Sequence, residues 1–380
     1  MFKLEKKTVN FLILILCLGI CGWVMRPYLW RAGDQNFSSG EVVSATNQSL
    51  TSPDGLVGFI QHLSVRLKTG EVIETSIGSE FQPLSQNQLL RQGTKVIVGK
   101  TSGLIDQQTY QVTDVDRSDL ILVLIILFAI AVVGVARFQG FSALVGMIVT
   151  LTILTVFVIP QLLSGANPIV ICLIGSFLIG GTSLYVAHGW NLKTHLGLLS
   201  VLGVMLFVSL LAWVSIEMGQ IVGLTSHEAY FLQFSSKVKI NVQGLLLGGI
   251  MLGTLGILDD IVLSQISVVF QLRQANRRLK IRELYDRGLH VGRDHVASLV
   301  NTLILAYAGA NLPLFLLFIN DQHLPWWVSI SNEVIAVEIV RSLIGSLGLI
   351  VAVPLATSLA AWFSYRLTAL QLKNLTVDEH

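Results

Sequence analysis

Long runs of apolar residues, broken by short polar stretches, make up most of this chain. The runs are about 20 residues long, which is the length an α-helix needs to cross the hydrocarbon core of a bilayer. We predict eight membrane helices, at residues 8–25, 120–136, 141–163, 169–187, 196–216, 244–270, 296–319 and 343–363. The expected fold class is a predominantly α-helical polytopic membrane protein.

Residues 31–118 depart from this pattern, because they are polar and contain short runs of alternating apolar and polar residues. Alternation with a period of two is typical of β-strands. Turn signals such as Lys68-Thr69-Gly70 and Gln92-Gly93 separate the runs. We predict a small β-barrel or sandwich, OB-like or SH3-like, with strands at residues 41–46, 62–67, 71–77, 94–100 and 109–115.

The chain is therefore expected to have four parts. They are an N-terminal membrane helix at 1–30, a β domain at 31–118, a seven-helix membrane domain at 119–366 and a tail at 367–380. The basic head and apolar run of the first part also fit a cleaved signal peptide, but no convincing A-x-A site follows, which favours a retained helix. The stretch 217–243 is either a plain loop or a re-entrant segment.

Composition agrees with the membrane class. The 380 residues are 53% hydrophobic and 13% charged, whereas soluble domains have about 25% charged residues. Cys17, Cys21 and Cys172 lie within apolar runs, and no Cys/His cluster suggests a metal site. Protease, esterase and P-loop signatures are missing from the sequence. We expect no enzyme activity, no cofactor or metal, and no nucleic-acid partner; membrane lipid is the expected surrounding.

The distribution of Lys and Arg predicts an orientation, because basic loops stay on the cytoplasmic side. The loops predicted at 164–168 and 320–332 carry no Lys or Arg. The loop after residue 270 is rich in them: Arg273, Arg277, Arg278, Lys280, Arg282, Arg287 and Arg293. An eight-helix path then places both termini in the cytoplasm and residues 31–118 on the extracytoplasmic side.

The stretch 244–272 is the one around which the chain is organised, because Asp259 and Asp260 lie well inside its apolar run. A carboxylate at the centre of a membrane helix costs roughly 2.5–3.5 kcal/mol on insertion scales, and is a functional hypothesis by default. Asp260 shares a helical face with Ser264 and Ser267. We predict that Asp260 lines a proton or cation pathway and that Asp259 points toward a neighbouring helix. The alternative is a structural carboxylate paired with another helix.

Glycines in the same helix occur at small-xxx-small spacings, which let a second helix approach closely. The two pairs are Gly244/Gly248 and Gly249/Gly253. They serve contacts either within one chain or between copies in a homo-oligomer.

The helix predicted at 296–319 adds Asn301, Tyr307 and Asn311 to the pathway. Tyr307 and Asn311 are four residues apart and share a face, and Leu312-Pro313 is a possible break.

Two groups of charged residues are candidate gates. Arg293, Asp294 and His295 either cap the helix predicted at 296 or form a cytoplasmic gate. Glu338 and Arg341 form either a local ion pair or a gate at the outer mouth.

Several long runs resemble the YibE/F family of bacterial multi-pass membrane proteins. They are GLLLGGI at 244–250, LGILDDIVLSQISVVFQLRQAN at 255–276, GLHVGRDHVASLVNTLILAYAGANLPLFLLF at 288–318 and EIVRSLIGSLGLIVAVPLATSLAA at 338–361, with HGWNLKTHLGLLSVL at 188–202. The resemblance covers roughly residues 120–365. It implies a polytopic protein of a bacterial inner membrane, with no settled substrate or reaction.

The polar stripe of the central helix favours an ion-coupled transporter or permease of unknown substrate. The alternative is a non-transporting envelope scaffold or sensor whose β domain binds a partner.

Overall fold

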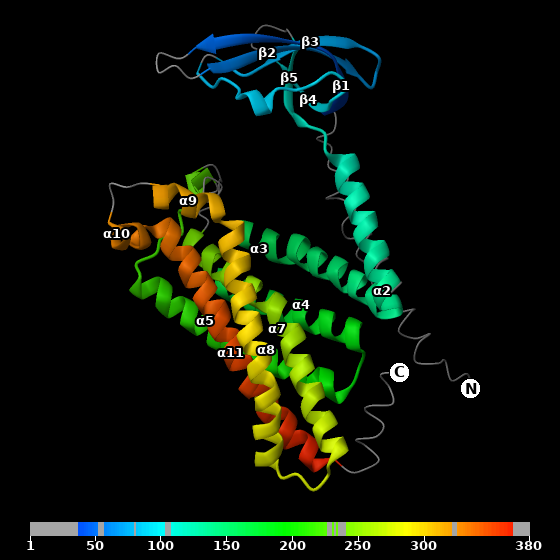
Figure 1. The fold of residues 1–380 in the computed structure, drawn as a ribbon, viewed down its shortest axis with the longest axis vertical. Helices are drawn as coiled ribbons and strands as arrows, with labels where there is room; N and C mark the ends of the chain where they lie inside the picture. Colours follow the sequence, from blue (N-terminus) through cyan, green and yellow to red (C-terminus); the bar gives the residue numbers. More distant parts are fainter. Residues whose placement is uncertain are drawn as a thin grey trace, which may run out of the picture. The chain divides into compact units, whose positions relative to one another are not determined.

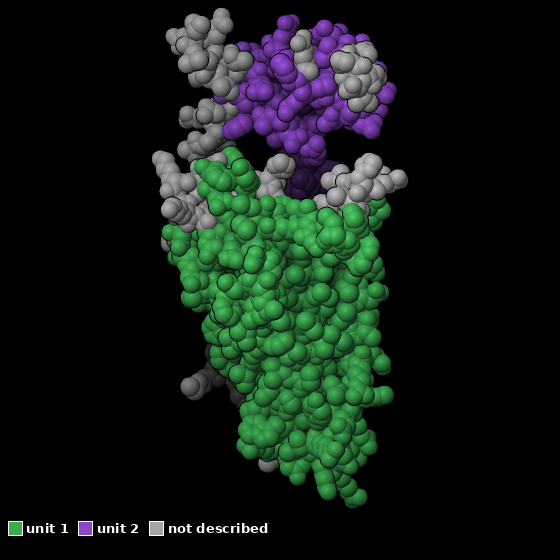
Figure 2. All heavy atoms as spheres, turned by 90° about the vertical axis from the view of Figure 1, so that its left-hand side faces the viewer, with its two compact units in different colours: residues 1–25, 138–380 green, residues 26–137 purple. Residues whose placement is uncertain are grey.

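The computed structural model describes residues 37–51, 57–79, 81–102, 108–225, 230–231, 233–234, 241–320 and 325–367. The chain divides into two compact units, residues 26–137 and residues 1–25 with 138–380 (Figure 2). The helix predicted at 8–25 lies outside the described residues.

Residues 37–115 form a curled, five-stranded antiparallel sheet in the order β3-β2-β1-β4-β5 (Figure 1). The strands are β1 (Phe37–Thr51), β2 (Val57–Leu67), β3 (Val72–Ile77), β4 (Lys95–Ser102) and β5 (Gln108–Val115). All five predicted strands are therefore confirmed, and β1 and β2 are longer than predicted.

Alternation decides which face of this sheet is buried, because successive side chains point to opposite sides. The buried face carries aliphatic residues from four strands: Val42, Leu63, Val65, Leu67, Ile73, Val96 and Val98. The two outer strands also meet, since the Thr75 hydroxyl on β3 donates to the Tyr110 carbonyl on β5 at 3.0 Å. This contact curls the sheet.

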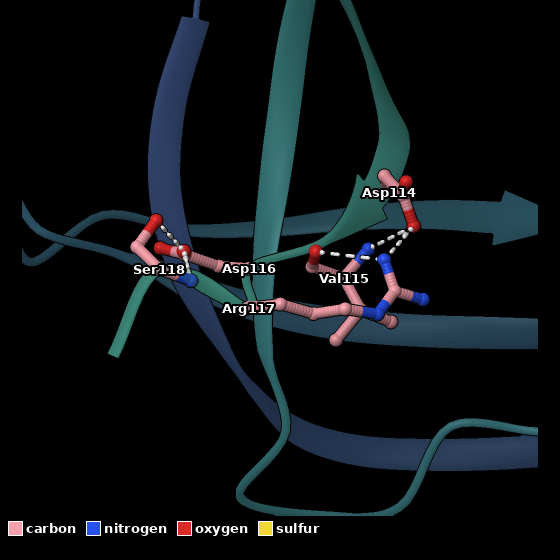
Figure 3. A network of polar contacts seen from close by, with 5 residues as sticks. All are labelled: Asp114, Val115, Asp116, Arg117 and Ser118. Atoms are coloured by element: carbon pink, nitrogen blue, oxygen red, sulfur yellow. Dashed lines mark hydrogen bonds and ion pairs between the residues drawn. The ribbon is translucent and has the colours of Figure 1, made fainter. Parts of the chain in front are cut away.

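A compact polar network joins β5 to the first described helix (Figure 3). Asp116 accepts hydrogen bonds from both the backbone nitrogen and the hydroxyl of Ser118, at 3.0 and 2.5 Å. Asp114 pairs with Arg117 at 2.9 Å. The Asp116 carboxylate thereby satisfies the backbone nitrogen of Ser118, the first residue of α2 (Ser118–Ile153).

Five helices among the described residues are long and apolar enough to cross a membrane. They cover Ser118–Leu163, Pro168–Val186, Leu192–Met218, Val242–Ala275 and Glu333–Arg366. The mostly helical fold with helices of membrane-spanning length is therefore confirmed, whereas the count of eight is not. The first of the five spans two predicted helices. It is 46 residues long, about 69 Å if straight, and its backbone leaves the helical region at Arg137 (φ 50°), inside the predicted 137–140 connection.

Helix α2 continues through a π-helical turn, η3 (Leu154–Val158), into α3 (Ile159–Leu163). The remaining helices are α4 (Pro168–His188), α5 (Leu192–Met218), α7 (Val242–Ala275), α8 (Ile281–Ala310), α9 (Leu312–Asn320), α10 (Trp326–Ser331) and α11 (Glu333–Arg366). Helix α7 contacts α4, α5, α8 and α11. It is the centre of the bundle.

The prediction for 271–320 was wrong in one respect. Helix α8 begins at Ile281, fifteen residues before the predicted start, so most of the expected loop is helical. The sequence obscures this because residues 281–295 are polar, and they extend α8 as an amphipathic helix. The expected break at Leu312-Pro313 is confirmed, since α8 ends at Ala310 and α9 begins at Leu312.

Helix α11 also starts earlier than predicted, at Glu333 instead of residue 343. The Asn332 side chain caps it by accepting from the Val334 nitrogen at 3.0 Å. The helix then continues through Pro354 to Arg366.

Candidate functional site

Asp259 and Asp260 lie midway along α7, seventeen and eighteen residues after its first residue, Val242. At 1.5 Å per residue, Asp259 is about 25 Å from either end of the helix. Neighbouring residues on a helix differ by about 100° in direction. The two carboxylates therefore face different surroundings.

Asp259 points at helix α4. A methyl group built on Gly180 of α4 would lie 3.7 Å from the Asp259 Oδ1 and 3.6 Å from Leu255. Ser183, three residues further along α4, is a polar neighbour of the carboxylate. The Asp259 Oδ1 is nevertheless fully buried and accepts no hydrogen bond from the described residues. The described ion pairs of the membrane helices do not include it.

Asp260 points about 100° away from Asp259 around the helix axis and is exposed on the surface of the bundle. Gly256 and Ser264 are exposed on the same side, and Ser267 is partly buried. The predicted stripe of Asp260, Ser264 and Ser267 therefore does share one helical face. It does not point into the packed interior.

The predicted glycine pairs make different contacts. Gly244 and Gly248 pack against α4, where built methyl groups would come within 2.6 Å of Pro168 and 2.3 Å of the Cys172 Sγ. A methyl group built on Gly253 would lie 2.9 Å from the Tyr307 hydroxyl of α8, whereas one built on Gly249 would meet no atom within 4 Å. The first pair thus holds two helices of one chain together.

Four of the predicted residues come together where α8 ends and α11 begins. The Asn311 Nδ2 donates to the Glu338 Oε2 at 2.9 Å. Glu338 also pairs with Arg341 at 3.3 Å. Tyr307 is close to both charged groups. This cluster, Tyr307–Asn311–Glu338–Arg341, confirms the shared face of Tyr307 and Asn311 and the local ion pair. The ion pair lies within α11, which begins at Glu333.

A family model for YibE/F-like proteins matches residues 124–366. The chain belongs to the YibE/F-like family. Comparison with curated proteins and with solved structures gives no significant match. The family match contains α7 with both carboxylates and the cluster at α8 and α11, whereas strands β1 to β5 precede it.

The other predicted residues of this YibE/F-like protein do not join either group. Arg293, Asp294 and His295 lie midway along α8, and their side chains are exposed. They do not cap its N-terminus, where the Lys280 nitrogen donates to the Glu283 carboxylate at 2.7 Å. Asn301 is also exposed.

The sequence did not predict that Gln265 of α7 connects two neighbouring helices by hydrogen bonds. Its side chain is 1% exposed. The Nε2 donates to the Gly288 carbonyl of α8 and to the Thr357 hydroxyl of α11, both at 2.7 Å. A glutamine on a helix otherwise rich in apolar residues was the available signal.

Two basic residues are buried in the bundle, and one of them, Arg273, does more than signal orientation. Lys193 at the start of α5 is 4% exposed and Arg273 near the end of α7 is 9% exposed. Arg273 donates to the carbonyls of Arg277 and Leu279, and its guanidinium lies 4.8 Å from the centre of the Tyr365 ring. Arg273 thereby fixes the turn between α7 and α8.

Proposed function

We propose that this protein is an ion-coupled membrane permease in which Asp259 binds and releases the coupling proton or cation. One observation carries the proposal: a carboxylate oxygen is buried halfway along a membrane helix without a hydrogen-bonding partner among the described residues. Ser183 is a donor beside the carboxylate, but Oδ1 is left unpaired, and an unpaired buried polar atom costs roughly 1–3 kcal/mol, which a purely structural carboxylate would be expected to avoid.

The packing around Asp259 supports this choice over Asp260. Transporters bind their coupling ions near the bilayer midplane, between helices that move relative to one another. Asp259 lies against Gly180, and the same two helices meet at Gly244 and Gly248. Such an interface of small residues brings two backbones close and leaves few interlocking side chains.

The test compares the two neighbouring carboxylates in liposomes. Ion flux, followed with a pH-sensitive dye under a proton gradient and then under Na⁺ and K⁺ gradients, is measured for the wild type, Asp259→Asn and Asp260→Asn. We expect Asp259→Asn to lower the flux at least tenfold and Asp260→Asn, which changes an exposed group, to keep most of it. Equal flux in wild type and Asp259→Asn would refute the assignment.

We further propose the topology that this function needs, with both termini cytoplasmic, the β unit extracytoplasmic and the residues at 8–25 as an eighth, retained span. Two features support it: the exposed basic residues Arg277, Arg278 and Lys280 gather at one turn, and the 46-residue run breaks at Arg137. The strand order and the β3–β5 contact favour an OB-like sheet.

A second function is favoured by one observation on the β unit, the 94% exposed side chain of Phe81. Large exposed aromatic residues are enriched at binding surfaces. In this alternative the β unit binds an envelope partner and the helices anchor it. A photo-crosslinking residue at position 81 of the full chain should then capture one specific protein, and the Gln82 position serves as the neighbouring control.

A further inference from the structure

Two adjoining cavities open where α5 ends and where α4 and α7 begin. They share Glu217, Asn241 and Gln243 in their walls. The larger has a volume of about 370 Å³ and the smaller about 150 Å³. Neither cavity includes Asp259 or the Tyr307 cluster among its lining residues.

The wall formed by the segment after α5 is held in place from two sides. The Gln243 Nε2 donates to the Ile221 carbonyl at 2.9 Å. Glu333, at the start of α11, accepts from the backbone nitrogens of Val222 and Gly223 at 2.9 and 2.7 Å. Gln220 adopts a left-handed backbone conformation, with φ 50°. This wall of the larger cavity is therefore preformed, which lowers the ordering cost of binding a ligand.

Glu217 sets the charge of this site. It is the single charged side chain among the described residues that line the two cavities. The other polar groups are the amides of Asn167, Gln220, Gln233, Asn241 and Gln243. The described part of the chain supplies no ion-pair partner for Glu217.

An anion does not suit these walls. The N-termini of α4 and α7 face the smaller cavity, but Asn167 accepts from the Ile169 nitrogen and Asn241 from the Gly244 nitrogen, at 3.0 and 2.9 Å. Both helix ends are thus capped by their own side chains. The Glu217 carboxylate would also repel an anion.

Trp213 adds a second group that attracts cations. It lies one helical turn before Glu217 on α5, and both residues line the smaller cavity. Aromatic faces attract ammonium groups through their quadrupole, and tryptophan does so most strongly. A carboxylate, an indole and several amide oxygens together match an ammonium ion with a small polar body.

We propose that this pair of cavities, which we call the Glu217 site, binds a small organic cation that carries an ammonium group. The ammonium group sits between Glu217 and Trp213 in the smaller cavity, and the amides of the larger cavity hydrogen-bond the rest of the molecule. This inference rests on the proposed permease function in one respect, because it makes an organic ammonium compound the substrate class and the Glu217 site its first binding position.

The test compares two ammonium probes with a neutral analogue that has the shape of one of them. Binding of choline and ethanolamine to the full-length protein in nanodiscs is measured by isothermal titration calorimetry and compared with 3,3-dimethylbutan-1-ol, the neutral carbon analogue of choline. We expect at least one ammonium probe to bind, with at least tenfold higher affinity than the neutral alcohol. Glu217→Gln and Trp213→Leu should each weaken binding at least fivefold.

Matched variants separate binding from folding and from transport. Glu217→Asp should restore part of the affinity lost in Glu217→Gln, and Asp286→Asn, which removes an exposed carboxylate of α8, should bind like the wild type. Asp259→Asn should bind the ammonium probe like the wild type. If the wild type binds the probe but carries no ion flux, the permease proposal alone is refuted. The Glu217 site is refuted if neither ammonium probe binds, if the neutral alcohol binds equally well, or if Glu217→Gln binds unchanged.

Discussion

At the scale of single residues, the direction of a side chain separates functional candidates that the sequence leaves equivalent. Asp259 and Asp260 are adjacent and chemically identical, yet one is turned toward Gly180 and the other is exposed. Their difference comes from the helical step of about 100° and from the neighbours that each direction meets. The same sensitivity to neighbours holds for the acidic residues outside the membrane helices.

The junction between β5 and α2 provides a residue-scale prediction of pH dependence. The Val115 amide and the Arg117 guanidinium lower the pKa of Asp114, and the Ser118 hydroxyl and amide lower the pKa of Asp116. Because both pKa values fall on folding, both carboxylates stabilise the junction above the unfolded value of about 3.9. This contribution is lost as the pH falls through the folded values.

NMR titration of aspartate carboxyl carbons checks this prediction in the full-length protein. Ser118→Ala should raise the pKa of Asp116 and leave that of Asp114 unchanged, because Ser118 contacts Asp116 alone of the two. An equal effect on both carboxyls would show that the network in Figure 3 is not formed in solution.

The sequence predicts which position carries function, but not which of two neighbouring side chains carries it. Two adjacent aspartates in an apolar run are enough to predict a functional position, because their burial is costly. Which of them meets a neighbour depends on Gly180, about 80 residues away in the chain and on another helix. No local pattern contains that information. Glu217 was missed for the same reason, since its cavity is built from three separate helices.

At the scale of elements, the interface between α4 and α7 depends on the absence of side chains at two positions. The Gly248 backbone lies directly against Cys172, and the Gly244 backbone against Pro168. The sequence predicted close approach from the spacing of these glycines, and the structure identifies α4 as the partner. The spacing alone did not distinguish this pair from Gly249/Gly253.

A pair of substitutions tests this interface. Gly248→Ala should lower the free energy of unfolding by about 1–3 kcal/mol, because its methyl would come within 2.3 Å of the Cys172 Sγ and force the helices apart. Gly249→Ala, the adjacent position with nothing within 4 Å, should be nearly neutral. Thermal or SDS-induced unfolding in the same detergent measures both.

The double variant Gly248→Ala/Cys172→Ala provides the control, because removal of the thiol makes room for the added methyl. It should recover part of the lost stability. If Gly248→Ala and Gly249→Ala behave alike, α4 does not pack on Gly248 as described.

Element boundaries were the least accurate part of the sequence prediction. The polar start of α8 and the early start of α11 at Glu333 were both taken for loops. Hydropathy finds only the portion of a helix at hydrocarbon depth, and it overlooks turns that continue the same helix into a polar environment.

At the scale of the whole molecule, the orientation of the chain across the membrane remains a prediction from Lys and Arg. It is tested with single cysteines in a variant that lacks Cys17, Cys21 and Cys172. Phe81→Cys in the β unit should react with a membrane-impermeant maleimide in intact cells, whereas Asp286→Cys on α8 should react only after the membrane is permeabilised. Both positions are exposed, so accessibility of the thiol does not bias the comparison. The reverse pattern would invert the topology.

The central claim is that Asp259 exchanges a proton or cation with water and is not permanently enclosed by the packed helices. The most direct measurement is labelling of Asp259 with the hydrophobic reagent dicyclohexylcarbodiimide, which reacts with protonated carboxyl groups, in an Asp260→Asn variant followed by peptide mass spectrometry. We predict that Asp259 is labelled and that the labelled fraction falls as the pH is raised or as a coupling cation is added. The account is contradicted if Asp259 is not labelled at any pH, or if its labelled fraction changes neither with pH nor with added cation.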